Sequence, residues 1–208
     1  MKLTIPNNLS EITVEKYLKA LDCLVEENTQ VRDIRLISVW CDIEPNKVVK
    51  LPVNEFKEIV EIIIKTLNQK PNLSHIIKVN GKDYGFEPEL EAMGSDAYID
   101  LSTYFDKDYL RAMAVLYRPI QMRMGRIYSI SEYKGTENYK DFLQCKASEI
   151  VGSRLFFYRL TNDLLKTIPK FLAENLTAEQ ITKMEASGVG IQQFTKLVEE
   201  IDLDLTKL

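Results

Sequence analysis

Residues that could do chemistry are few and scattered along this chain. His75 is the single histidine, and the three cysteines, Cys23, Cys41 and Cys145, are widely spaced. A zinc site built on several histidines is therefore excluded, and no CxxC or HExxH spacing is present. The sequence also lacks the GxGxxG and GxxxxGK[ST] loops that cradle phosphates. We expect no catalytic residue, no cofactor and no metal ligand, so the protein is not expected to be an enzyme; an unrecognised enzyme is the residual alternative.

The distribution of charge is more informative. The net charge of −4 disfavours a general nucleic-acid binder, which carries a basic excess. Residues 107–159 hold ten Lys or Arg against five Asp or Glu, whereas the rest of the chain holds seventeen against twenty-six. Tyrosines alternate with these arginines, and both residue types anchor protein interfaces. We predict an interaction surface made of Arg111, Arg118, Arg123, Arg126, Tyr128, Tyr133, Arg154 and Arg159.

Two other interpretations of residues 107–159 stay open. The tyrosines could belong to the core and the arginines to a solvated face, or the same mixture could lie along nucleic-acid phosphates. Because the remaining chain has the opposite charge, we expect head-to-tail self-association or an ordered assembly.

Composition and length predict one globular domain over residues 1–208. Hydrophobic residues make up 45% and charged residues 28%, with no low-complexity tract. We divide the domain into a helical part (1–70), a hairpin with helices (71–135) and long C-terminal helices (136–208). The first ten residues lack the apolar core of a signal peptide, and the longest apolar run is broken by Glu61 and Lys65. We therefore expect a soluble intracellular protein with no membrane partner.

Helical signals dominate the first part of the chain. Residues 3–5 are expected to form a short edge strand, Thr13 to cap a helix, and residues 31–40 to form a second helix. Asn54 is the expected cap of a third helix, and one helical turn is expected between Pro45 and Pro52. A DNA-binding helix-turn-helix is disfavoured, since the third helix offers glutamate and lysine heads outside and an apolar face inside.

Farther along, Asn80-Gly81 lies between two β-prone runs, as a two-residue hairpin turn requires. Ser95 or Asp96 is expected to cap a short helix. Asp106 is expected to cap a helix over 107–117, which Pro119 ends. A second β segment is expected at 125–133.

The C-terminal part is expected to be helical from Thr136 to about residue 168. A capping box at Thr177 and a last helix over 189–200 complete the pattern. The predicted fold class is mainly α (α+β), a helical domain with one or two small β-hairpins.

Residues 74–172 resemble a group of small proteins encoded among the structural and tail genes of tailed bacteriophages, including crAss-like phages of gut Bacteroidetes. The resemblance is carried by the Asn80-Gly81 turn, by "YIDL" at 98–101 and by "LYRP" at 116–119. It includes no signature of reaction chemistry. At the last motif, we expect Arg118 to pair with Asp100 or Asp106 and hold the corner after the helix.

The resemblance implies a virion-associated protein, a neck or tail component or packaged cargo, that acts by protein–protein binding. The implied partners are the neck, portal or tape-measure protein, and the implied location is the virion, after synthesis in the bacterial host cytoplasm. A non-virion tail-assembly chaperone for the tape-measure protein is the alternative. A nucleic-acid-associated or host-directed regulator is the further alternative.

Overall fold

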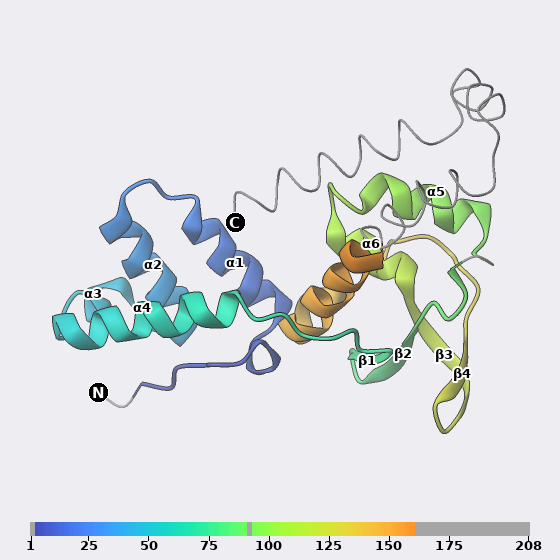
Figure 1. Cartoon of the computed structure of the whole chain (residues 1–208), viewed down its shortest axis with the longest axis horizontal. Helices are drawn as coiled ribbons and strands as arrows, with labels where there is room; N and C mark the ends of the chain where they lie inside the picture. Colours follow the sequence, from blue (N-terminus) through green and yellow to red (C-terminus); the bar gives the residue numbers. More distant parts are fainter. Residues whose placement is uncertain (1–2, 91–92, 161–208) are drawn as a thin grey trace, which may run out of the picture. The chain divides into compact units, whose positions relative to one another are not determined.

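The computed structural model describes residues 3–90 and 93–160 (Figure 1). The chain divides into two compact units, residues 1–153 and 154–208, and the single domain over 1–208 stays a prediction. In chain order the elements are η1 (Leu9–Glu11), α1 (Val14–Leu24), α2 (Thr29–Cys41), α3 (Pro45–Val48), α4 (Val53–Leu67), β1 (Ile76–Val79), β2 (Lys82–Phe86), α5 (Ser95–Tyr104), α6 (Tyr109–Leu116), β3 (Tyr117–Met124), β4 (Ile127–Ile130) and η3 (Tyr139–Gln144). Residues 147–153 are also helical and end the first unit.

Helices α1 to α4 pack around Trp40, which is fully buried. The indole Nε1 donates a hydrogen bond of 2.9 Å to the carbonyl oxygen of Pro6, so its polar atom is satisfied. The other buried members of this core are Leu9, Ile12, Ala20, Cys23, Leu36, Ile37, Val48, Ile59, Ile63 and Ala147. Burial of each large apolar side chain contributes about 1.5–3 kcal/mol.

Polar caps set where α1 and α2 begin. The Thr13 hydroxyl accepts a hydrogen bond from the Lys16 amide at 3.3 Å, and the Asn28 side chain accepts from the Gln30 and Val31 amides. Each cap satisfies amides that the first helical turn leaves open. The predicted Thr13 cap and the predicted second helix are confirmed.

The expected strand at residues 3–5 is wrong, because these residues have no strand assignment. The helical turn after Pro45 is confirmed as α3. Asn54 is not the cap of α4, since the helix begins at Val53 and Pro52 occupies the cap position. Helix α4 turns buried Ile59 into the core, as the packing interpretation requires.

The hairpin at Asn80-Gly81 is confirmed. Strands β1 and β2 are antiparallel, and Val79 lies opposite Lys82 at the turn. Asn80 has φ of 49° and Gly81 of 79°, the positive values that a two-residue turn of this kind needs.

The predicted fold class, mainly α (α+β) with one or two small β-hairpins, is wrong. The four strands form one antiparallel sheet in the order β1-β2-β3-β4, so the fold is α+β. The sheet is continuous because Phe86 of β2 lies opposite Tyr117 of β3, and Tyr84 lies opposite Pro119. This pairing joins segments far apart in sequence, which local patterns do not reveal. Strand β4 lies within the predicted segment 125–133.

Helix α6 passes into β3 with no loop between them. Tyr117, the first strand residue, is fully buried and donates from its hydroxyl to the carbonyl oxygen of Ser74 at 2.6 Å. Its ring meets that of Phe86 edge to face, with the centroids 5.2 Å apart. The Glu87 amide donates to the carbonyl oxygen of Leu116 at 2.8 Å. Burial raises the pKa of Tyr117, so its hydroxyl keeps the proton that it donates.

The ends of α6 agree only in part with the ends predicted from the sequence. Asp108, not Asp106, caps the helix, because its carboxylate accepts from the Arg111 amide at 3.2 Å. The expected stop before Pro119 is confirmed, since the helix ends at Leu116.

The long helix predicted from Thr136 is wrong in its first part. Residues 139–144 form the 3-10 helix η3, and Lys146 then forms an isolated antiparallel bridge with Thr13. The Val14 amide donates to the carbonyl oxygen of Cys145 at 2.9 Å, which ties this segment to the start of α1. Within the second unit, residues 154–160 are helical. The capping box at Thr177 and the helix over 189–200 lie outside the described residues.

Gly85 permits a close contact between β2 and β4. A Cβ at this position would lie 2.4 Å from Cε2 of Tyr128 and 2.8 Å from Cγ2 of Ile130. The Tyr128 hydroxyl donates to the carbonyl oxygen of Phe86 at 2.8 Å. The missing side chain therefore lets the Tyr128 ring lie over β2 and fasten β4 to it.

We predict that Gly85→Ala lowers the free energy of unfolding by about 1–3 kcal/mol, because the new methyl group displaces the Tyr128 ring. Denaturant unfolding of the full chain measures this change. A double-mutant cycle supplies the control: in a Tyr128→Ala background, Gly85→Ala should cost clearly less. Fully additive costs would contradict the close contact.

Candidate interaction surface

The β3–β4 hairpin extends past the rest of the sheet. Strand β2 pairs only with residues 117–119 of β3, so residues 120–130 pair only with one another (Figure 1). A register shift between Ile120 and Met122 bends the strand where it leaves β2. We call residues 120–130 the arm.

One face of the arm is apolar and exposed. Met122, Met124 and Ile127 are 66%, 74% and 79% exposed. Met122 and Met124 alternate along β3, and Ile127 lies opposite Met124, so the three side chains share a face. Gly125 has φ of 62° in the turn between them. Neighbouring exposed apolar side chains of this kind make the arm a candidate binding surface.

Three of the predicted surface residues lie on the arm. Arg123 donates to the carbonyl oxygen of Gly125 at 3.1 Å and to the Asp83 carboxylate at 3.3 Å, and its side chain stays 48% exposed. Arg126 is exposed at the turn. Tyr128 faces the sheet, with its hydroxyl bound to the backbone, so it holds the arm in place.

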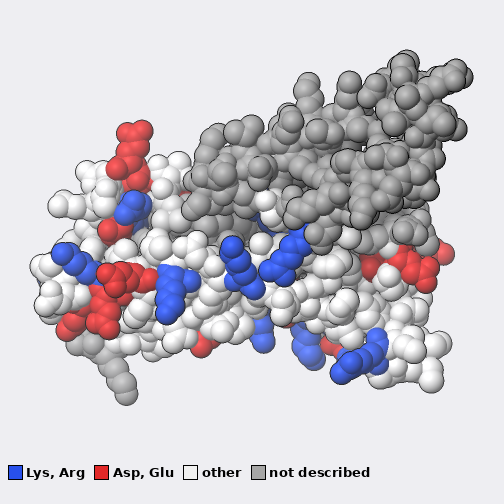
Figure 2. Space-filling model, viewed as in Figure 1, with Lys and Arg blue, Asp and Glu red and all other residues white. Residues whose placement is uncertain are grey.

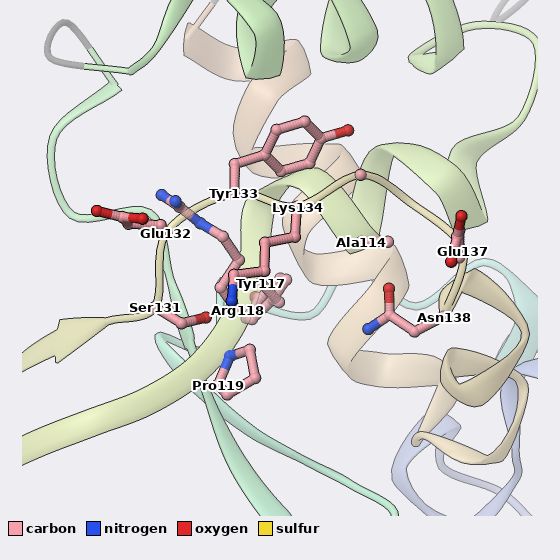
Figure 3. A pocket seen from close by; sticks show the side chains of 11 residues that line it. Ala114, Tyr117, Arg118, Pro119, Ser131, Glu132, Tyr133, Lys134, Glu137 and Asn138 are labelled. Atoms are coloured by element: carbon pink, nitrogen blue, oxygen red, sulfur yellow. The ribbon is translucent and has the colours of Figure 1, made fainter.

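At the base of the arm, the start of β3 borders a pocket of about 250 Å³ (Figure 3). Arg118 extends from β3 toward Glu132 and Tyr133 in this view. Its guanidinium pairs with the carboxylate of Glu87, and the side chains are only 15% and 9% exposed. Among the described residues, its Nε is a buried nitrogen without a hydrogen-bond partner. Burial lowers the pKa of Arg118. The paired carboxylate of Glu87 compensates the buried charge.

Tyr133 binds a different carboxylate at the same pocket. Its hydroxyl donates to the Asp100 carboxylate, which connects the segment after β4 to helix α5. Burial, and then this hydrogen bond, raise the pKa of Tyr133, so the hydroxyl remains a donor at neutral pH. The expected pairing of Arg118 with Asp100 or Asp106 is therefore wrong, since Glu87 occupies the guanidinium and Tyr133 occupies Asp100.

Arg111 of α6 makes its contacts with other residues of the fold. Its Nε donates to Asp108 at 3.2 Å, and an Nη donates to the Thr136 hydroxyl at 3.3 Å. Its guanidinium carbon lies 4.3 Å from the ring centroid of Tyr139 and 5.4 Å from that of Tyr104. These contacts connect α5, α6 and η3, so Arg111 is a structural cation more than a surface anchor.

Arg154 and Arg159 belong to the second unit. Both are exposed on the helical residues 154–160. Within the first unit, the structure brings Arg118 and Tyr133 together at the pocket and Arg123, Arg126 and Tyr128 together on the arm.

The described residues on the face seen in Figure 2 place Lys and Arg side chains across the middle and Asp and Glu mainly toward the ends. No cluster of three or more His, Cys, Asp or Glu side chains within residues 3–90 and 93–160 could hold a metal ion. In the same residues, no helix has the length and apolar character to cross a membrane.

Sequence reasoning missed the apolar face of the arm. Its signal is the alternation of Met122 and Met124 with polar neighbours before Gly125. The pattern was hidden because residues 117–124 follow a helix directly and contain Pro119 near their start. Glu87 was also missed, since its partner lies far away in sequence.

We predict that Glu87→Gln lowers the free energy of unfolding by about 3 kcal/mol, because it leaves the buried Arg118 guanidinium without its carboxylate. Replacing both partners, as Glu87→Leu with Arg118→Met, should recover much of this loss. Denaturant unfolding at fixed pH measures all three proteins.

The matched control is Asp83→Asn, which removes a carboxylate that the more exposed Arg123 and Lys78 share. It should cost less than about 1 kcal/mol, because exposed ion pairs contribute little. Equal losses for the two single variants would contradict a special role for the buried pair.

Comparison of the chain with protein-family models, with curated proteins and with solved structures finds no match.

Proposed function

We propose that this chain is a virion-associated bacteriophage protein, a neck or tail component or packaged cargo, that acts by protein–protein binding. The observation that carries the proposal is the exposed apolar face of the arm, formed by Met122, Met124 and Ile127. The resemblance of residues 74–172 to phage structural and tail-region proteins supplies the biological setting.

The arm suits binding because its own fold holds it in one orientation. The bulge near Met122, the Tyr128 contact across β2 and the Arg118–Glu87 pair fix how it leaves the sheet. A binding element that is already ordered loses less conformational entropy when a partner docks. Its methionines adapt to different surfaces, because their side chains are unbranched and polarizable.

The same methionines favour the second candidate, a tail-assembly chaperone. A chaperone for a long helical tape-measure protein must bind varied apolar helix faces. The exposed side chains of Met122 and Met124 can adapt to such faces. It would leave before the particle matures. The two candidates therefore differ in whether the protein stays in the finished particle.

We predict that quantitative mass spectrometry finds the protein at a fixed copy number in purified, genome-filled particles. Lysate from the same culture provides the comparison. An arm variant, Met122→Ser with Met124→Ser and Ile127→Ser, should lower incorporation at least about tenfold, since it removes the apolar contact area.

A control variant, Val25→Ser with Val53→Ser, changes two exposed valines outside the arm and should be incorporated normally. Abundance in lysate and absence from particles, with a long helical tail protein co-purifying, would overturn the virion role in favour of the chaperone. Salt-sensitive retention on DNA with absence from particles would favour the regulator.

A further inference from the structure

The arm combines its apolar face with positive charge. Residues 120–130 contain Arg123 and Arg126 and no Asp or Glu. Arg126 lies in the turn next to Ile127, so a cation accompanies the exposed apolar side chains. A partner surface that fits the arm must be apolar at its centre and acidic around it.

Helix α5 offers a surface of that description. Tyr98 and Ile99 are 64% and 60% exposed, and Asp96 is exposed one turn before Ile99. Residues 83–106 carry seven Asp or Glu and no Lys, Arg or His. The exposed apolar side chains of the arm thus lie in a segment whose charged residues are all basic. Those of α5 lie in a segment whose charged residues are all acidic.

The exposed face of α5 is held outward by contacts on its other side. Ala97 is buried, and the Tyr133 hydroxyl donates to the Asp100 carboxylate. In Figure 1 the tip of the arm points away from α5 of the same copy. The two surfaces therefore meet only if each belongs to a different copy.

We propose that the arm of one copy docks on helix α5 of a second copy, which joins the chains head to tail. Met122, Met124 and Ile127 cover Tyr98 and Ile99, while Arg126 approaches the acidic side chains around them. Such an interface leaves one arm and one α5 free in every dimer, so it continues into a ring or a filament. This inference rests on the proposed function and names the partner of the arm.

The test uses the full chain in three forms. The first is the wild type, the second is the arm variant defined above, and the third is an acceptor variant, Asp96→Arg with Ile99→Arg. Sedimentation velocity over a range of concentrations measures their association. We expect the wild type to form oligomers larger than dimers that weaken in high salt, because charge contributes to the contact. Each variant alone should associate at least about tenfold more weakly.

Mixing the two variants gives the decisive result. The intact α5 of the arm variant and the intact arm of the acceptor variant should form one-to-one heterodimers that grow no further. Oligomers of either variant equal to those of the wild type would overturn the proposal, and so would a mixture that stays monomeric. Unchanged circular dichroism spectra and melting temperatures confirm that both variants are folded.

Failure here is distinguishable from failure of the proposed function. If the wild type stays monomeric but is present in particles, the self-association proposal is wrong and the virion role stands. If the wild type assembles through the arm and α5 but is absent from particles, the virion role is wrong and the self-association proposal stands. An acceptor variant that assembles like the wild type would show that α5 serves a different protein or another segment of the chain.

Discussion

Tyr117 directly follows helix α6 and is the first residue of strand β3, and the described fold depends on this junction. Its ring and hydroxyl are buried against Phe86 and Ser74, so β3 can leave α6 in only one direction. The next residue, Arg118, places a positive charge in the same buried corner, and Glu87 neutralises it. Because Glu87 also donates its amide to Leu116, the carboxylate and the backbone close the corner together.

The contacts of Tyr117 and Arg118 set the direction in which the arm leaves the sheet. Beyond Pro119 the strand loses its neighbour β2, and only β4 continues beside it. A hairpin supported on one side would be loose, but Tyr128 reaches back over Gly85 and fastens it to β2. Buried polar contacts at the base thus allow an apolar face at the tip to remain exposed and ordered, which is what a docking element requires.

Local sequence signals predicted some local elements, missed others such as the caps of α4 and α6, and failed where distant segments meet. Thr13 and Asn80-Gly81 identified a cap and a turn, because their chemistry acts within a few residues. The pairing of Phe86 with Tyr117 carries no such local signal, so one or two small hairpins were expected where one four-stranded sheet exists. Arginine and tyrosine content singled out residues 107–159, and the arm lies within them. This content did not separate exposed Arg126 from Tyr128, which packs inward.

The central claim is that the arm is the binding surface, and hydrogen–deuterium exchange tests it most directly. Backbone exchange would be compared between the dispersed and the assembled wild-type protein. The account predicts slower exchange on assembly in peptides covering residues 120–130 and residues 95–104, and no change over 53–67 of α4. Protection confined to α4, with the arm exchanging equally fast in both states, would contradict it.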